Sequence, residues 1–366
     1  MIRSSKKSDA IYNQLRQEIL AGRWVVGCKL PNESEIAQRF GCSIGTVSKA
    51  VGVLVHEGLV ERRSRAGTRV LRNSVGHAAP AGARLDAFAF IYPSEQHEGI
   101  WRIVKGFNDA AREEGRRVVM LTTGADYQKE SELLGRLSEF DVRGAVVYPV
   151  VPSPQDQIHF STMLLASRFP VVLAEVNLPG LRCPAVVADG LHAGYTVTRH
   201  LIERGHRRIG FFSNYAWVPF MRDRYLGYRW ALSDAGISEC AQWVMLENSM
   251  HPVFDDLLRE PTELARHYLR KCKSLDGVVC ANDFLAFGLI NAARERGIRV
   301  PEDLKVAGID DFAMSPSEIL PLTTYHIPYE GMGRRAFEVL SEVSDQPSSL
   351  LMEIQLRGEL VVRQST

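Results

Sequence analysis

The sequence of 366 residues predicts an α/β protein, with parallel sheets covered by helices on both faces, preceded by a small basic domain. From Ala87 onward, short runs rich in β-branched residues alternate with segments of helical period. The runs Gly277–Cys280 and Lys305–Ile309 are each followed by polar residues. These polar groups are thereby placed at the carboxyl edge of a sheet, where ligands bind. Residues 1–72 contain 13 Lys/Arg against 6 Asp/Glu, a net charge of +7, whereas the remainder carries −6. This asymmetry favours a nucleic-acid-binding domain attached to a larger body.

The basic region begins with three predicted helices. The first, Asp9–Ala21, has an apolar residue at every fourth position. Asn32 caps a second helix that ends at Phe40, and Ser43 caps a third that Gly58 ends. One face of the third helix is apolar, with Val47, Ala50, Val51 and Leu54. Its opposite face is small and polar, with Gly45, Ser48, Lys49 and Gly52, so this helix can lie close to DNA.

Two short strands follow, Leu59–Arg63 and Thr68–Leu71, around a basic tip at residues 63–65. Three helices and a hairpin of this length are typical of a winged helix-turn-helix domain. Residue by residue, Ala10–Leu71 resembles the DNA-binding domain of the GntR family. The matching segments are IYNQLRQEILAGRW, KLPNESEIAQRFGCS, TVSKAVGVLVHEGLVERR and AGTRV. The resemblance implies that double-stranded operator DNA is a partner.

The chain departs from the GntR pattern at positions that matter for DNA recognition. The family often has Arg after the Glu of the LP-x-E motif and at two positions of the recognition helix. Here these positions hold Ser34, Ile44 and Ser48, and Arg65 or a close neighbour replaces the Gly that usually opens the wing. We therefore do not transfer the family's guanine-reading arginines to this chain.

The remaining residues of this surface still suit DNA. The amino end of the third helix offers free N–H groups to a phosphate, hydroxyls can bond phosphates or base edges, and Ile44 can meet a thymine methyl. Basic wing residues suit the minor groove. The predicted DNA-binding residues, with Glu33 of the LP-x-E motif, are Glu33, Ser43, Ile44, Thr46, Ser48, Lys49, Arg63, Arg65 and Arg69. For each of them, an ordinary solvated side chain is the alternative.

A segment without apolar period, Asn73–Arg84, is rich in Gly, Ala and Pro, as linkers are. We therefore expect a DNA-binding domain at residues 1–72, a linker at 73–84, and an effector-binding and dimerisation domain at 85–366.

The large domain shows a regular alternation of strands and helices, and two short strands finish it. The predicted strands are Ala87–Tyr92, Arg117–Leu121, Gly144–Tyr148, Val171–Ala174, Arg208–Phe212, Gln242–Leu246, Gly277–Cys280 and Lys305–Ile309. The predicted helices are His97–Gly115, Gln128–Glu139, Gln155–Arg168, Gly190–Arg204, Arg222–Gly236, Thr262–Cys272, one that Gly297 closes, and Glu330–Glu342.

Four motifs of this domain resemble the LacI/GalR type of sugar-sensing repressor, over roughly residues 86–363. They are DGLHAGYTVTRHLIERGHRRIGFFSN at Asp189–Asn214, RYLGY at Arg224–Tyr228, the segment Asp276–Phe312, and PLTTY at Pro321–Tyr325. The resemblance implies a two-lobed periplasmic-binding-protein-like fold, three chain crossings between the lobes, and a sugar bound between them.

In the resembled family, three positions of the second lobe hold sugar hydroxyls, and their counterparts are Arg224, Asn282 and Asp310. A guanidinium, a carboxamide and a carboxylate together satisfy hydroxyls that both donate and accept hydrogen bonds. Asp283 and Asp311 are the structural alternatives, expected to cap helices or to fix their neighbours. Strand ends and aromatic positions of the family add further candidates. The predicted ligand-binding residues are Tyr92, Ser94, Trp101, Arg224, Asn282, Asp310 and Tyr329.

Sequence motifs of catalysis are missing. There is no G-x-S-x-G, P-loop or H-E-x-x-H, and no G-x-G-x-x-G after a strand, so we expect no enzyme. The six cysteines form no C-x-x-C and no metal-binding Cys/His spacing, which favours reduced thiols in the cytoplasm and predicts no metal and no cofactor. There is neither an apolar run of membrane-spanning length nor an apolar segment typical of a secretion signal, so we expect no membrane contact.

We therefore predict a cytoplasmic transcriptional regulator, acting as a repressor, that binds operator DNA as a homodimer. A small sugar-like effector between the lobes controls its DNA affinity, to the extent that it prefers one conformation over the other. Release of DNA by an inducer is the first hypothesis, and an effector acting as co-repressor or activator is the second. A transport-type sugar-binding protein without a DNA role is the alternative, and the basic head argues against it.

Overall fold

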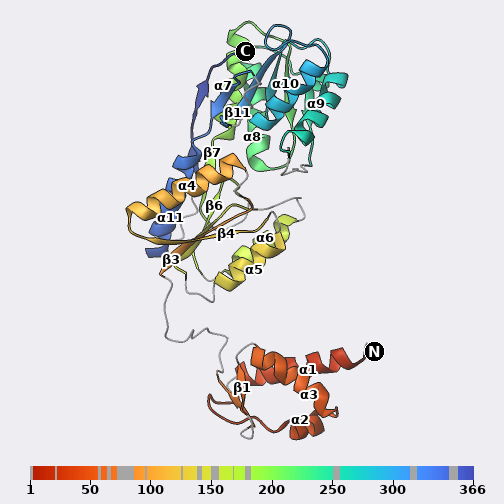
Figure 1. Ribbon diagram of the computed structural model, residues 1–366, viewed down its shortest axis with the longest axis vertical. Coiled ribbons are helices and arrows are strands. Elements are labelled where there is room, and N and C mark those ends of the chain that lie inside the picture. The colour runs from red at the N-terminus through yellow and green to blue at the C-terminus, as the bar shows by residue number, and fades with distance from the viewer. Residues whose placement is uncertain are drawn as a thin grey trace. The chain divides into compact units, whose positions relative to one another are not determined.

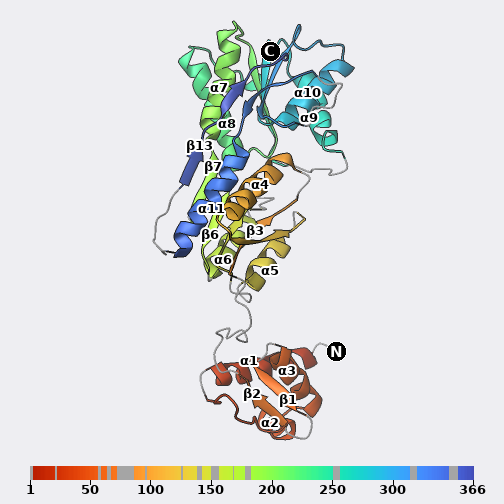
Figure 2. The same ribbon diagram turned by 60° about the vertical axis from the view of Figure 1, so that its left-hand side comes forward.

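The computed structural model describes residues 3–20, 23–56, 59–63, 67–71, 86–94, 97–124, 127–137, 142–149, 156–167, 169–177, 183–249, 256–313, 320–345 and 353–366 (Figures 1 and 2). The chain forms two compact units, Met1–Gly82 and Ala83–Thr366, which we call the head and the body.

The head contains three helices and an antiparallel hairpin, as predicted. They are α1 (Arg3–Leu20), α2 (Glu33–Phe40), α3 (Ile44–His56), β1 (Val60–Arg63) and β2 (Gly67–Val70). Asn32 caps α2 in a reciprocal capping box: its side chain accepts from the Glu35 N–H at 2.8 Å, and its own N–H donates to the Glu35 carboxylate at 2.8 Å. The first helix begins six residues before the predicted start. There, the Ser8 hydroxyl donates to the Thr46 carbonyl of α3 at 3.5 Å, a tertiary contact that apolar period does not reveal. The predicted helix end at Gly58 lies outside the described residues.

The first lobe of the body is built on a six-stranded sheet in the order β13-β7-β6-β5-β3-β4. Along β3, Phe88 and Phe90 pack with α4 and α11, whereas Ala89 and Ile91 pack with α5 and α6. Successive residues of a strand point to opposite faces, so these four side chains show that helices cover both faces of the sheet. The elements are β3 (Ala87–Tyr92), α4 (Glu98–Glu113), β4 (Arg117–Thr122), α5 (Tyr127–Leu137), β5 (Gly144–Val147), α6 (Asp156–Ala166), β6 (Val171–Ala174), β7 (Ala185–Ala188), α11 (Tyr329–Asp345) and β13 (Glu353–Leu356).

The second lobe repeats this plan with the strand order β14-β12-β11-β10-β8-β9, in which β14 is antiparallel to β12. Figures 1 and 2 show α7 and α8 on one side of this sheet and α9 and α10 on the other. The elements are α7 (Gly190–Glu203), β8 (Ile209–Ser213), α8 (Pro219–Asp234), the 3₁₀ turn Ala241–Trp243, β9 (Val244–Leu246), α9 (Arg259–Lys271), β10 (Gly277–Cys280), α10 (Asp283–Glu295), β11 (Lys305–Asp310), β12 (Thr323–His326) and β14 (Glu359–Val361).

The chain crosses between the lobes three times: from β7 to α7, from β12 to α11, and from β13 to β14. These are the crossings that the sensor resemblance implies, and they confirm the predicted two-lobed α/β fold. Two crossings lie side by side, since the Asp189 N–H donates to the Leu356 carbonyl at 2.9 Å and Arg357 Nε pairs with the Asp189 carboxylate at 2.8 Å.

Two strands were not predicted from the sequence, β7 and β12. Each is only four residues long, AVVA and TTYH, and each gains its place by pairing in a parallel sheet with neighbours distant in sequence. Because such short runs carry no period of their own, tertiary pairing decides their structure.

Candidate functional site

Arg224, on α8, is the centre of a buried polar group between the two lobes. Its side chain is only 1% exposed, and its Nη2 lies 2.9 Å from Asp310 Oδ1 and 3.9 Å from Glu175 Oε1. Tyr329 Oη donates to the same Asp310 oxygen at 2.8 Å. Glu175 follows β6 of the first lobe and Asp310 ends β11 of the second, so the group joins both lobes. We call Arg224, Asp310, Glu175 and Tyr329 the interlobe cluster.

Several buried polar atoms at or beside the interlobe cluster have no hydrogen-bond partner within the described part of the chain. They are Arg224 Nε, Glu175 Oε2 and His97 Nδ1. Leaving a buried donor or acceptor unsatisfied costs about 1–3 kcal/mol, so such atoms are rare in folded proteins. Donors and acceptors are both present, which is the combination that a ligand with hydroxyl groups satisfies.

The backbone at the two carboxylates adopts conformations that residues other than glycine rarely take. Asp310 has φ 137° and Glu175 has φ 64°, and the following residue Asp311 has φ 58°. Positive φ values at non-glycine residues cost about 1–3 kcal/mol each and gather at functional sites. Both strand ends therefore bear strain at the point where their carboxylates meet Arg224.

Burial dominates the electrostatics of the cluster. It raises the pKa of Glu175 to about 7, with the Asp310 charge acting in the same direction and Arg224 opposing it. Burial also raises the pKa of Asp310, again against the effect of Arg224. Burial and the Arg224 charge lower the pKa of His97 to about 4, so this imidazole is neutral near pH 7. Burial thus opposes ionisation of both carboxylates, and the Arg224 guanidinium favours it.

We expect Glu175 to make the stability of the body fall with rising pH. Its folded-state pKa is raised from 4.5 to about 7, so the folded state holds the proton more tightly than the unfolded state. Stability is thus lost as the pH rises across that window. Glu175→Gln should flatten this part of the dependence, which thermal unfolding of both proteins at several pH values measures. A variant with a steeper fall than the wild type would contradict the assignment.

The other predicted second-lobe residue, Asn282, serves as the cap of α10. Its Oδ1 accepts from the Leu285 N–H at 2.9 Å, and its Nδ2 donates to Asn214 Oδ1 at 3.4 Å. The cap is thus Asn282 and not its neighbour Asp283. Asp283 fixes two other segments instead: its oxygens accept from the Thr324 hydroxyl at 2.6 Å and from the Phe312 N–H at 3.0 Å.

Three of the predicted ligand-binding residues come from the first lobe outside the cluster. Tyr92, at the end of β3, is 2% exposed and packs edge-on against Phe90 at 5.9 Å, and Ser94 lies half-buried just beyond it. Trp101, on α4, is 47% exposed and is therefore not one of the buried groups of the cluster.

Sequence reasoning missed Glu175 and His97 as site residues. Glu175 carries the same signal that marked Asp310, a polar residue directly after a buried β-branched run, here Val171–Ala174. The His97 ring packs against the second-lobe rings of Phe284 and Phe312, with ring centroids at 5.6 and 5.4 Å. These contacts join residues 187 and 215 positions apart, so no local sequence pattern predicts them.

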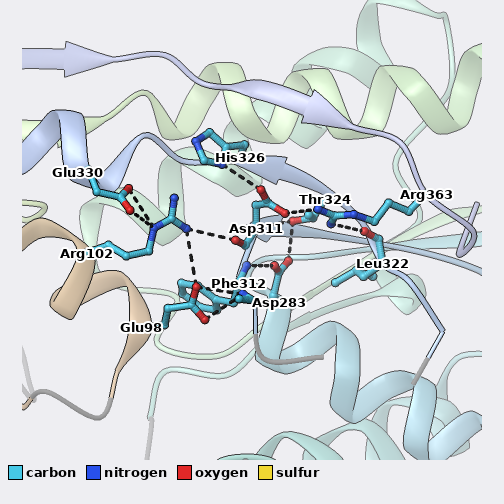
Figure 3. Close-up of polar contacts among 11 residues, drawn as sticks. Glu98, Arg102, Asp283, Asp311, Phe312, Leu322, Thr324, His326, Glu330 and Arg363 are labelled. Atoms are coloured by element: carbon cyan, nitrogen blue, oxygen red, sulfur yellow. Dashed lines mark hydrogen bonds and ion pairs between the residues drawn. The ribbon is translucent and has the colours of Figure 1, made fainter. Parts of the chain in front are cut away.

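A second set of contacts holds the lobes together beside the cluster (Figure 3). Glu98, on α4 of the first lobe, accepts from the Ala313 N–H at 2.9 Å with both carboxylate oxygens. Arg102, one turn later, donates to the Asp311 carbonyl at 3.2 Å and pairs with Glu330 of α11 at 3.0 Å. We call Glu98, Arg102 and the backbone of residues 311–313 the interlobe latch. Because Asp311 directly follows Asp310, the latch fixes the turn on which the cluster carboxylate lies.

The side chain of Asp311 holds that turn to the second lobe. Its carboxylate pairs with Arg363 Nη2 at 2.6 Å and with His326 Nδ1 at 2.9 Å, and Arg363 also donates to the Leu322 carbonyl at 2.8 Å (Figure 3). The expectation that Asp311 fixes its neighbours agrees with this geometry.

In the head, the predicted DNA-binding residues of α3 form an open surface. Ile44 is 53% exposed, and an added Cβ at Gly45 or Gly52 would meet nothing within 4 Å. Ser43 caps the helix: its hydroxyl lies 2.8 Å from that of Thr46 and accepts from the Thr46 N–H at 3.3 Å. The face that the sequence predicts to be small and polar is therefore exposed and unobstructed within the head.

The remaining predicted DNA-binding residues lie around this surface. Lys49 is exposed, and Arg69 is exposed with its Nη1 donating to the Gly27 carbonyl at 2.8 Å. Glu33 and Ser48 both contact Arg62 of β1. Arg65 and the side chain of Arg63 lie outside the described residues.

Comparison with known proteins gives two family matches. Residues 7–70 match bacterial regulatory proteins of the gntR family, and residues 198–366 match the periplasmic binding protein-like domain. The arabinose metabolism transcriptional repressor of Geobacillus stearothermophilus is 30% identical over 97% of this chain and 97% of its own.

Solved structures share the fold. A LacI family transcriptional regulator from Mycobacterium smegmatis is 26% identical and covers 76% of this chain and 99% of its own, with a TM-score of 0.66. The transcriptional regulator CelR in complex with cellobiose is 22% identical and covers 92% of this chain and 100% of its own, with a TM-score of 0.68. None of the helices among the described residues is long and apolar enough to cross a membrane.

Proposed function

This chain belongs to the bacterial transcriptional repressors that combine a GntR-type DNA-binding domain with a periplasmic-binding-protein-like domain, and we propose that a neutral monosaccharide bound at the interlobe cluster controls its affinity for operator DNA. It is a transcriptional regulator with a DNA-binding and a sugar-sensing domain, a class that is not enzymatic. We place the DNA-binding domain at residues 1–72, the linker at 73–84 and the effector domain at 85–366. Binding to operator DNA in the cytoplasm as a homodimer, and release by the sugar, complete the proposal.

The observation that carries the proposal is the set of unsatisfied polar atoms around Arg224. Arg224 Nε is a donor, Glu175 Oε2 is an acceptor when ionised, and His97 Nδ1 takes either role according to its tautomer. A sugar hydroxyl donates one hydrogen bond and accepts others, so one small polyol supplies partners of both kinds. The aromatic rings of Tyr329 and Phe312, which stack at 6.0 Å, add apolar surface beside these atoms.

The charge of the cluster favours an uncharged effector over a phosphorylated or acidic one. Arg224 is already paired with Asp310, and Glu175 adds further negative charge as it ionises. A phosphate or carboxylate brought into this site would face these buried carboxylates without an additional cation in the cluster. The similar protein from Geobacillus stearothermophilus is named for arabinose metabolism, so arabinose is the sugar to test first.

The test has two parts. A thermal-shift series compares arabinose with other pentoses, hexoses, arabinose 5-phosphate and arabinonic acid, and a neutral sugar at 100 times its Kd should stabilise the body by about 2.7 kcal/mol. Fluorescence anisotropy with DNA selected in vitro from a random library then measures whether that sugar lowers DNA affinity. Stabilisation by the phosphorylated sugar alone, or a neutral sugar that binds without changing DNA affinity, would contradict the proposal.

We expect the interlobe latch to support sugar binding without touching the sugar. Arg102→Met removes the bond to the Asp311 carbonyl, which joins the two lobes, together with the pair to Glu330 within the first lobe, and should weaken sugar binding about tenfold, or about 1.4 kcal/mol. Arg112→Met is the matched control, since Arg112 lies on the same helix but is 72% exposed and forms an ion pair with Asp109, three residues earlier on that helix. Calorimetric titration of both variants checks this. Equal affinities in the two variants would remove the latch from the mechanism.

A further inference from the structure

Arg62, on β1 of the hairpin, reaches across to the recognition helix α3. Its Nη2 donates to the Ser48 carbonyl at 2.9 Å and to the Ser48 hydroxyl at 3.1 Å, and it pairs with the Glu33 carboxylate at the start of α2. The side chain of Arg62 nevertheless remains 41% exposed. Three segments of the head thus meet at one guanidinium.

The place where Arg62 lies is the exposed face of α3. Ser48 is one turn after Ile44, and it is flanked on this face by Gly45 and Gly52, above which there is open space. The helix provides no arginine of its own here, because Ile44 and Ser48 stand where the family often has one. Arg62 therefore places a guanidinium beside the middle of α3, where the helix has no arginine of its own.

We propose that Arg62 is a specificity-determining residue that reads a guanine edge in the major groove beside α3; this rests on the proposed binding of operator DNA. All three contacts use Nη2, and within the described part of the chain Nε and Nη1 have no hydrogen-bond partner. The planar fork of arginine matches O6 and N7 of guanine, the most frequent base-specific contact in protein–DNA complexes. Ser48 and Glu33 hold the guanidinium in place, so little side-chain freedom is lost when DNA binds.

Glu33 acts as a positioning residue in this arrangement. A free carboxylate beside DNA would repel phosphates, and pairing with Arg62 neutralises it. The predicted contribution of Glu33 to DNA binding is thus indirect, through the orientation of Arg62.

The experiment is in vitro selection from a random DNA library with the full-length protein, followed by affinity measurements on the selected site and its single-base variants. The wild type should prefer guanine at one position of each half-site. Arg62→Met should lose that preference, so that the bases at this position differ by less than about twofold, and its affinity for the guanine site should fall about 10- to 100-fold. Lys49→Met is the control for charge alone. It should weaken binding to all DNA sequences alike, and it should reduce the slope of log affinity against log salt concentration by about one, as expected for the loss of one phosphate contact.

Arg62→Lys separates base reading from a structural clamp. Lysine keeps the positive charge beside Glu33 but loses the fork, so the clamp largely survives while bidentate recognition does not. A guanine preference that is weakened in Arg62→Lys and lost in Arg62→Met, with unchanged unfolding temperatures, supports the proposal, and a guanine preference that Arg62→Met retains overturns it. A wild type that selects no sequence at all would overturn this inference together with the proposed function. A sugar that leaves wild-type DNA binding unchanged would overturn the proposed function alone.

Discussion

Arg224→Ala is expected to abolish the response to the sugar while sugar-free DNA binding persists. The substitution removes the buried cation and leaves Asp310 and Glu175 as neighbouring carboxylates without it. Breaking a buried pair from one side costs about 3–5 kcal/mol, and sugar affinity should therefore fall more than about 100-fold. The sugar-induced thermal shift and the sugar dependence of DNA anisotropy measure the loss.

The control for this variant lies two residues earlier on the same helix. Arg222 is 57% exposed and, among the residues that the structure describes, pairs with the adjacent Asp223 alone, so Arg222→Ala should change sugar affinity by less than about twofold. Arg224→Lys adds a graded test, because lysine keeps the charge but cannot reproduce the fork that contacts Asp310 and donates to the Ala281 carbonyl at 2.6 Å. A normal sugar response in Arg224→Ala would show that the interlobe cluster is not the effector site.

The sequence predicts the bounds of several strands that are buried on both faces, although β6 and β10 are no longer than the missed strand β7. The bounds of β3, β6 and β10 agree with the predicted ranges because each is an uninterrupted apolar run. By contrast, β7 and β12 are defined by their partners in the sheet, which lie far away in the chain. Helix ends differ by a few residues, since caps and tertiary contacts such as that of Ser8 decide them.

For the site, sequence motifs supply residues but not their partners. The structure brings Arg224, Asp310 and Tyr329 together, and all three were candidates from motif positions. In the structure, Asn282 is also a helix cap. Its Oδ1 accepts from the Leu285 N–H, and this bond competes with a ligand for the same oxygen. Glu175 joins from the other lobe, across a separation of 49 residues from Arg224 that no local period encodes.

The head contains a buried carboxylate of its own. Removing its main partner should weaken DNA binding and leave sugar binding unchanged, the reverse of what is expected for Arg224→Ala. Glu18 of α1 is 5% exposed and accepts from Arg39 Nη1 at 3.0 Å, from Gln14 at 3.2 Å and from Trp24 Nε1 at 3.4 Å. The hydrogen bond from Arg39 is the main reason why the pKa of Glu18 falls to about 2. A lowered carboxylate pKa stabilises the folded head above the ordinary value of 4.5, and this stabilisation is lost as the pH falls toward 2. The pair thus joins α1 to α2 across the whole physiological range.

Arg39→Met should destabilise the head by roughly 2–3 kcal/mol, because it leaves the Glu18 charge buried without its main partner. Glu18→Met should cost less, about 1 kcal/mol, since the arginine left behind is 41% exposed and can turn to water. A domain of this size has only about 5 kcal/mol to lose, so Arg39→Met should strongly weaken DNA binding at elevated temperature while sugar binding to the body is unchanged. Hydrogen exchange of head amides, combined with DNA and sugar titrations, tests both statements.

Arg39→Met and Arg224→Ala would then each remove one function and leave the other intact, as expected if the head and the body fold as separate domains. Loss of sugar binding in Arg39→Met, or equal costs for the two head variants, would contradict this view.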